Sequence, residues 1–280
     1  MRTARLIPFL GLSAALVGGA TVTPAAVATP AAAAAPVGPA AINTCPAAKS
    51  TVQRTVPATQ AKNVAITFDD GPSPKWTPQI LDILKRNNVK ATFFVIGDNA
   101  RAHPAILKRI YAEGHFIGNH TQTHPNMKDL SASAQASQLD QGTRSISVAL
   151  GGSYKPCYFR PPYGSYNTTT FNAAKQRGMS FIMWSHDTND WRTPGSVSSS
   201  FQNSIVSQGT IPAGHHPNVL MHDSSQIPGS FRQNTVDSVQ RIVTYYRSRG
   251  YSFTDPVGAP SRSPHLAPSP VSRPSGCRHP

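Results

Sequence analysis

Two histidines and a pair of adjacent aspartates are the residues of this sequence with the clearest potential for chemistry. His120 and His124 lie four positions apart, which lets both imidazoles face one metal ion from a helix or a tight turn. Asp70 could supply a third, oxygen ligand, and two histidines with one carboxylate leave an open position for water, as in catalytic zinc sites. Asp69 cannot easily bind the same ion in the same manner, so it is free to act as a base. Taken singly, each pair has a simpler interpretation. The two histidines could lie on the surface by chance, and the two aspartates could belong to a solvated Asp-Asp-Gly-Pro turn.

Two further side chains could complete such a site. Arg160 precedes a Pro-Pro turn that would fix the backbone, and an arginine can hold a carboxylate ionised and oriented. A structural salt bridge is the alternative for Arg160, and the two interpretations are compatible. His222 ends an apolar run, and a lone histidine there is more often structural. Asp190 could orient this imidazole, which favours an acid–base role.

The elements that must position these residues alternate along the chain between short apolar runs and amphipathic segments. The runs predict strands at 64–68, 91–96, 115–118, 158–160, 181–184, 219–222 and 251–254. The spacing predicts helices at 106–110, 131–150, 169–177 and 236–246. It also predicts one helix that begins near 77 and another that ends at 209. Such βα-type units indicate an α/β protein with a largely parallel sheet, either a closed or partly closed barrel or an open doubly wound sheet. No Gly-x-Gly-x-x-Gly turn follows the first strand, which weakens a dinucleotide-binding fold.

Polar side chains gather at the carboxyl ends of these predicted strands. Ligands and chemistry collect at that end in parallel α/β folds. The residues are Asp69 and Asp70 after the first strand, His120 and His124 after the third, Arg160 at the end of the fourth, Asp187 and Asp190 after the fifth, and His222 at the end of the sixth. Five strands that each deliver a polar group to one rim are hard to explain as surface decoration.

Together these segments resemble the polysaccharide deacetylases of carbohydrate esterase family 4, which share the NodB homology domain. Five motifs of that family occur in order across residues 64–222, and each appears intact. They are Thr67-Phe68-Asp69-Asp70-Gly71-Pro72-Ser73, His120-Thr121-Gln122-Thr123-His124-Pro125, Arg160-Pro161-Pro162-Tyr163, Asp187-Thr188-Asn189-Asp190-Trp191 and Leu220-Met221-His222. One such motif would be a weak signal, whereas five in order at domain spacing are a strong one.

The resemblance implies a single catalytic domain with a distorted, TIM-barrel-like (β/α)7 fold and metal-dependent removal of acetyl groups from sugars. It also implies a role for each motif residue. Asp70, His120 and His124 would hold Zn2+ or another divalent transition metal, Asp69 would be the general base, His222 the general acid, Arg160 and Asp190 their orienting partners, Tyr163 an oxyanion donor through its backbone N–H, and Trp191 and Leu220 the lining of the acetyl pocket.

Both ends of the chain differ in composition from this domain. Residues 1–28 combine a cationic start, an apolar run and a small-residue cleavage site, which predicts a signal peptide and an exported or cell-wall-associated protein. An uncleaved membrane anchor is the alternative, but the apolar run is shorter than the roughly 20 residues of a spanning helix. Residues 29–59 are interpreted as an Ala/Pro-rich spacer and N-terminal segment, 60–255 as the deacetylase domain, and 256–280 as a disordered Pro/Ser/Arg-rich tail.

The cysteines are Cys45, Cys157 and Cys277, and export makes one disulfide plausible. The favoured pair is Cys45 with Cys157, because both flank the folded region rather than the tail. A Cys45–Cys277 bond would instead tie the two ends of the chain together. The spacing does not decide between them.

The leading functional hypothesis is a secreted N-deacetylase of a GlcNAc-containing polymer, chitin-type or peptidoglycan, that acts as a monomer. An acetylxylan esterase would use the same site on oxygen, and a carbohydrate-binding protein with a dead site belongs to a different class. The formal net charge of +14 suits an anionic cell wall but does not select a polymer. A nucleic-acid partner is not expected, because the sequence combines export with no DNA-binding motif.

Overall fold

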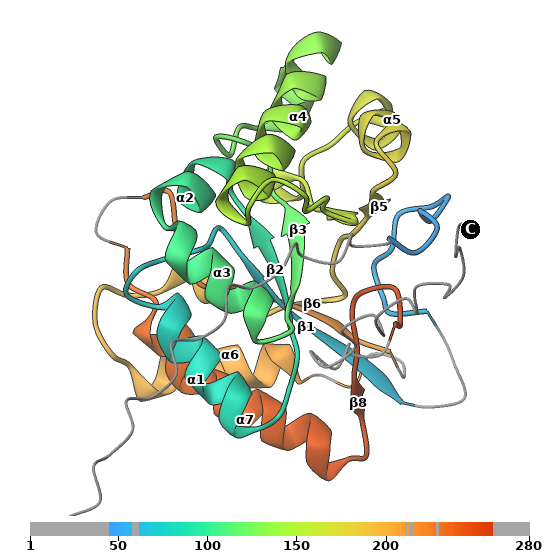
Figure 1. The fold of residues 1–280 in the computed structure, drawn as a ribbon. Coiled ribbons are helices and arrows are strands. Elements are labelled where there is room, and N and C mark those ends of the chain that lie inside the picture. Colours follow the sequence, from blue (N-terminus) through green and yellow to red (C-terminus); the bar gives the residue numbers. More distant parts are fainter. Residues whose placement is uncertain (1–44, 58–61, 211, 213–215, 228–229, 260–280) are drawn as a thin grey trace, which may run out of the picture. The chain divides into compact units, whose positions relative to one another are not determined.

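The computed structural model describes residues 45–57, 62–210, 212, 216–227 and 230–259, all within one compact unit, Pro39–Pro280 (Figure 1). The strands are β1 (Asn63–Asp69), β2 (Thr92–Val95), β3 (Phe116–Asn119), β4 (Tyr158–Phe159), β5 (Ser180–Phe181), β6 (His186–Asp187), β7 (Asn218–His222) and β8 (Ser252–Phe253). The α-helices are α1 (Thr77–Arg86), α2 (Gly97–Ala102), α3 (Pro104–Ala112), α4 (Ala132–Ala149), α5 (Thr168–Gln176), α6 (Ser199–Gly209) and α7 (Gln233–Ser248). Short 3-10 turns lie at η1 (Met127–Asp129), η2 (Pro162–Gly164) and η3 (Asp190–Arg192).

The strands form one parallel sheet in the order β5-β4-β3-β2-β1-β7-β6, and β8 pairs with the start of β1. Strand β1 is central, and all of its residues are buried. A strand covered on both faces reads as a nearly continuous apolar run, which is why its sequence stands out. The end strands β5 and β6 are not paired with each other among the described residues, so the sheet is a curled half-barrel. The expected α/β barrel-like class is confirmed.

Amphipathic helices cover this sheet as their sequence spacing predicts. Helices α1 and α7 lie side by side in Figure 1 and share one apolar cluster with β1. Ile80, Leu81 and Leu84 of α1 are fully buried in that cluster, at the spacing of one helical face. No helix in the described part of the chain is long and apolar enough to cross a membrane.

The fifth predicted strand, residues 181–184, is confirmed at Phe181 and Ile182, but the separate strand β6 that follows was not predicted. The chain leaves the sheet after β5 and rejoins it on the far edge as β6, which pairs with β7. Between them the carbonyl of Met183 accepts hydrogen bonds from Arg160 at 3.1 Å and from Asn218 at 2.6 Å. The backbone N–H groups of Ile182 and Met183 still donate to the carbonyls of Phe159 and Gln53, so the strand ends within the predicted run and β6 begins beyond it. Asp187 therefore lies in a strand of its own. Helix α2 was also not predicted.

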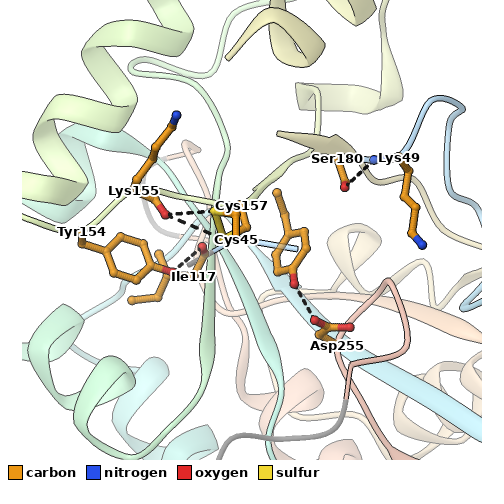
Figure 2. The surroundings of a disulfide bond; sticks show 9 residues. Cys45, Lys49, Ile117, Tyr154, Lys155, Cys157, Ser180 and Asp255 are labelled. Atoms are coloured by element: carbon orange, nitrogen blue, oxygen red, sulfur yellow. Dashed lines mark hydrogen bonds between the residues drawn. A yellow bond between two sulfur atoms is a disulfide. The ribbon is translucent and has the colours of Figure 1, made fainter. Parts of the chain in front are cut away.

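A disulfide joins Cys45 to Cys157 at the start of β4, with a Cα–Cα distance of 5.2 Å (Figure 2). The favoured pairing is confirmed. The N-terminal segment it anchors runs along the β5 edge, where Gln53 N–H donates to the Phe181 carbonyl at 2.8 Å. Lys49 N–H donates to the Ser180 hydroxyl at 3.1 Å. The predicted signal peptide, most of the spacer, Cys277 and most of the tail lie outside the described residues.

The disulfide closes a long stretch of chain, since its cysteines are 112 positions apart. Replacing Cys45 and Cys157 by Ser restores the entropy of the open unfolded chain, and we expect the free energy of unfolding to fall by about 2–4 kcal/mol. Urea unfolding measures this by comparing the Cys277→Ser protein with the same protein carrying both further substitutions, so that neither protein has a free cysteine. Equal unfolding midpoints would contradict the expected contribution.

Candidate active site

Asp69 ends β1 and Asp70 follows it, and the backbone turns sharply at the second residue. Asp70 has a φ of 75°, in the left-handed region that non-glycine residues rarely adopt. Both side chains are buried, at 3% and 6% exposure. The turn directs two adjacent carboxylates from one strand end toward different partners, an arginine for Asp69 and two imidazoles for Asp70.

His120 and His124 come from the turn that follows β3, not from a helix. His124 itself has a φ of 62°. Helix α4 holds this turn, because the Gln138 side-chain oxygen accepts hydrogen bonds from two of its backbone N–H groups at 3.0 Å each. The spacing of four residues therefore brings the imidazoles together through a tight turn, one of the two geometries that the sequence allowed.

The side chains of Asp70, His120 and His124 converge, and one ligand atom from each lies within 4.8 Å of the others. Asp70 Oδ1 lies 3.1 Å from His124 Nε2 and 3.5 Å from His120 Nε2. It is buried and accepts no well-formed hydrogen bond among the described residues. Burial raises the pKa of Asp70, but the two imidazoles and His222 outweigh it and hold that pKa well below its usual range. An ionised carboxylate aimed between two imidazoles fits a divalent transition metal.

The remaining ring nitrogen of His120 fixes how this imidazole faces the site. His120 Nδ1 lies 2.7 Å from the Arg160 carbonyl oxygen, which can only accept, so Nδ1 carries the proton. The Nε2 lone pair is then directed toward Asp70 and His124. Outer partners of this kind orient metal-binding histidines and raise their basicity.

Arg160 is fully buried and forms an ion pair with Asp69, with Nη1 at 2.7 Å from Oδ1. The same nitrogen donates to the Thr67 hydroxyl at 2.8 Å. The guanidinium also stacks on Phe94, with Cζ 4.1 Å from the ring centre. Burial lowers the pKa of Arg160, and the Asp69 charge opposes this effect. The salt bridge fixes the Asp69 carboxylate in one orientation, so the structural and the orienting interpretations hold together.

His222, which is partly buried, and the fully buried Asp190 form a second pair at the same rim. His222 Nδ1 lies 2.7 Å from Asp190 Oδ1, and the His222 backbone N–H donates to Oδ2 at 2.8 Å. Thr235 donates to the same Oδ2 at 2.8 Å. Burial lowers the pKa of His222, but the Asp190 carboxylate outweighs it and raises that pKa to about 9. His222 is paired with Asp69 in the β1–β7 register, so the two lie on neighbouring strand ends.

These groups open onto one pocket of about 420 Å³. Leu220 lies in its wall, and Tyr163 and Trp191 stand at its edge with 70% and 49% exposure. The pocket contains every predicted site residue except Arg160 and Asp190, which lie behind Asp69 and His222. The sequence-predicted residues are thus brought together.

The polysaccharide deacetylase family model matches residues 57–182. A chitooligosaccharide deacetylase from Sinorhizobium fredii is 33% identical over 206 residues, which cover 71% of this chain and 93% of that protein. The chain belongs to the polysaccharide deacetylase family. A peptidoglycan-N-acetylglucosamine deacetylase from Bacillus cereus is 38% identical over 197 residues, which cover 68% of this chain. The match spans 65% of that relative's length.

The fold of the polysaccharide deacetylase family also matches in solved structures. The crystal structure of the Bc1960 peptidoglycan N-acetylglucosamine deacetylase superposes with a TM-score of 0.66 at 32% identity, covering 76% of this chain and 95% of that one. These relatives are named as N-acetylglucosamine and chitooligosaccharide deacetylases, which supports the predicted enzyme class, a hydrolase of carbon–nitrogen bonds.

Sequence reasoning missed several residues of this polysaccharide deacetylase site. Trp184 and Arg232 line the pocket, and Arg232, only 3% exposed, donates to the Asp190 carbonyl at 3.4 Å. Asp223, beside His222, is fully buried, and burial with the nearby Asp70 and Asp69 charges raises its pKa to about 7. Of these residues, Asp223 is the one that the sequence could have indicated, because it is a charged residue that directly follows an apolar strand.

The pKa of His222 depends on Asp190, and Asp190→Asn should lower it because the carboxylate charge that raises it is removed. The wild-type imidazole holds its proton up to about pH 9, whereas the variant loses it at lower pH. An NMR pH titration of the imidazole C–H signals measures the midpoint. Thr235→Val is the matched control, since it removes a hydrogen bond to the same carboxylate but keeps the charge. A midpoint unchanged in Asp190→Asn would contradict the assigned cause.

Proposed function

We propose that this chain is an exported, metal-dependent hydrolase that removes N-acetyl groups from a GlcNAc-containing polysaccharide. The observation that carries the proposal is the meeting of three groups in one pocket. These are the Asp70–His120–His124 ligand set, the Arg160-oriented Asp69 and the Asp190-paired His222. Amide hydrolysis needs an activated water, stabilisation of the oxyanion and a proton for the departing nitrogen, and each of these groups suits one requirement.

The metal ligands are Asp70, His120 and His124, and zinc is the expected ion. Bound there, zinc would lower the pKa of water to roughly 7 and would polarise the acetyl carbonyl. His120 suits this role because its Nδ1 is held by the Arg160 carbonyl. Two imidazoles and one carboxylate would leave positions on the metal for water and the substrate oxygen.

Asp69 acts as the general base that accepts a proton from the attacking water. Its Oδ1 is held by Arg160, and Oδ2 lies 3.8 Å from His120 Nε2, on the side of the metal ligands. A carboxylate fixed in this way meets the water without losing rotational freedom during the reaction. Arg160 is its positioning residue.

His222 acts as the general acid that protonates the departing amine nitrogen. Its pKa of about 9 leaves it protonated at neutral pH, and Asp190 holds Nδ1 so that Nε2 is available for the substrate. General acid or base help of this kind contributes typically about 10²–10⁴ in rate. Returning the proton from Asp69 to His222 would complete the cycle.

The pocket wall provides substrate contacts. The Tyr163 backbone N–H is the proposed oxyanion donor, and Tyr163 lies with a φ of 59° in the turn that borders the pocket. Leu220 and Trp191 would contain the acetyl methyl group. The exposed rings of Tyr163 and Trp191 offer flat apolar surfaces that suit the faces of sugar rings.

The polymer is proposed to be peptidoglycan or a chitin-type oligomer, because the similar proteins are named for N-acetylglucosamine and chitooligosaccharide deacetylation. Export is supported by the composition of residues 1–28 and by the Cys45–Cys157 disulfide, since such bonds persist in oxidising compartments. The protein would then act outside the cell or in the cell wall.

The base and ligand roles are separated by two variants of neighbouring groups. Asp69→Asn should keep bound zinc, but its deacetylation rate should fall about 10²–10⁴-fold, because the amide cannot accept the water proton. His120→Ala should lose the zinc itself. Elemental analysis of both purified proteins, with thermal melting to verify folding, gives the comparison. Wild-type activity in zinc-loaded Asp69→Asn, or full zinc occupancy in His120→Ala, would overturn the respective role.

The substrate assignment is tested by acetate release from chitooligosaccharide, peptidoglycan and acetylated xylan, each with and without a chelator. We expect release from the GlcNAc polymers that stops with chelator and returns with added zinc. Release from xylan alone would indicate an O-deacetylase. Polymer binding with no acetate release would favour an inactive binding protein, and either result would refute the proposed function.

A further inference from the structure

Asp223 is a buried carboxyl that the proposed chemistry leaves without a role. It directly follows His222 at the end of β7 and has no exposed surface. Its Oδ2 accepts a hydrogen bond from the Thr77 hydroxyl at 2.5 Å, while Oδ1 is buried with no hydrogen-bond partner among the described residues. Burying a carboxyl so incompletely paired is costly, so its position calls for a physical reason.

Thr77 connects Asp223 to the loop that carries Asp70. The Thr77 hydroxyl donates to Asp223 and accepts from the Ser73 backbone N–H at 2.7 Å, so both of its bonding directions are used. The Asp223 backbone N–H donates to the Asp69 carbonyl at 3.2 Å. Asp223 therefore holds the chain on both sides of Asp70, at Asp69 and at the loop from Ser73 to Thr77.

The Asp223 carboxyl also packs directly against the residue after Asp70. A Cβ placed on Gly71 would lie 2.2 Å from Asp223 Oδ2 and 2.4 Å from Oδ1, so only glycine permits this approach. Two other bonds complete the enclosure of the loop. Asn99 donates to the Asp70 carbonyl at 2.6 Å, and the Ile96 N–H donates to the Gly71 carbonyl at 3.2 Å.

The enclosure matters because Asp70 has a φ of 75°, a backbone conformation that persists only where the surroundings enforce it. If the loop relaxed, the Asp70 carboxylate would turn away from the two imidazoles that it faces at 3.1 and 3.5 Å. Those imidazoles are anchored separately, through Arg160 and through α4. The carboxylate is thus the ligand whose position depends on Asp223.

We propose that Asp223, acting through Thr77 and Gly71, is a positioning residue that sets the metal affinity of the site by holding Asp70 in its ligating conformation. This inference rests on the proposed function, because it requires that the wild-type protein bind a divalent metal at Asp70, His120 and His124. It assigns a role to a residue outside the pocket lining and outside the ligand set.

The test compares Asp223→Ala, Thr77→Val and Thr77→Ser with the wild-type protein. Zn2+ dissociation constants are measured by competition with a chromophoric chelator, and the absorption spectrum of Co2+-loaded protein reports the ligand geometry. Thr77→Val keeps the size of the side chain but removes both hydrogen bonds, whereas Thr77→Ser keeps the hydroxyl. We expect affinity to fall about 10–100-fold in Asp223→Ala and Thr77→Val, with an altered Co2+ spectrum, and to stay near wild type in Thr77→Ser.

Asp255→Asn is the matched control for a merely structural role. Asp255 is also a buried carboxyl, 1% exposed, and its Oδ2 accepts a hydrogen bond of the same 2.5 Å length from the Tyr158 hydroxyl (Figure 2). It joins β4 to the end of β8 and contacts none of the site residues through these bonds. We expect Asp255→Asn to lower the melting temperature but to bind Zn2+ as the wild type does.

Two outcomes would overturn the inference, and a third would refute the proposed function. Wild-type affinity in folded Asp223→Ala and Thr77→Val would show that Asp70 holds its place without Asp223. If Asp223→Ala fails to fold, Thr77→Val decides alone. A Zn2+ affinity in Thr77→Val equal to that of the wild type would then show that Asp70 holds its place without this contact. Equal weakening in Asp255→Asn would reduce the effect to general destabilisation. A wild-type protein that binds no divalent metal would instead refute the proposed function on which the inference rests.

Discussion

The buried ion pair between Arg160 and Asp69 is the interaction on which the rest of the site depends. Taking both charges out of water is costly, and only close pairing with additional hydrogen bonds compensates for it. Arg160 meets that requirement with partners on several strands. It donates to Asp69 and Thr67 of β1 and to the Met183 carbonyl between β5 and β6. The guanidinium therefore orients a carboxylate and also joins β1 to the segment that follows β5.

The same arginine influences the metal ligands through its backbone. Its carbonyl accepts the His120 Nδ1 proton, which directs Nε2 of that ring toward Asp70. One residue at the end of β4 thus orients the proposed base by its side chain and one proposed ligand by its main chain. A substitution there would disturb both functions together, which explains why a purely structural and a purely catalytic interpretation of Arg160 are hard to separate.

Two adjacent aspartates can have distinct roles because their surroundings differ. Asp69 faces a guanidinium, whereas Asp70, turned by its positive φ, faces two imidazoles. On the neighbouring strand end, Asp190 supports His222 and raises its pKa to about 9. Because their surroundings differ, titratable side chains at the same rim can have different pKa values and partners, and the rim can supply both an acid and a base. The curled parallel sheet makes this arrangement compact, because the residues come from neighbouring strand ends.

Much of the fold was predictable because its signals are local. The all-buried β1 reads as an apolar run, and α1 and α4 show amphipathic spacing close to their observed bounds. The predicted strand at 181–184 ends after Ile182, and the strand β6 that follows was missed because no local pattern indicates the crossover between them. The Met183 carbonyl accepts hydrogen bonds from Asn218 of β7 and from Arg160, which follows β4, and the chain then crosses to the opposite edge of the sheet as β6.

By itself, the sequence determined the α/β class, the rim at which polar residues gather and the residue types that can bind metal or transfer protons. These follow from periodicity, strand ends and short motifs, all carried by neighbouring residues. Only the tertiary structure decided that Cys45 pairs with Cys157, that His120 and His124 meet through a turn, that Arg232 lies beside Asp190, and that Asp223 packs on Gly71 and Thr77. The disulfide and the Asp223–Thr77 bond join residues more than 100 positions apart, and such partners are selected by packing across the whole sheet.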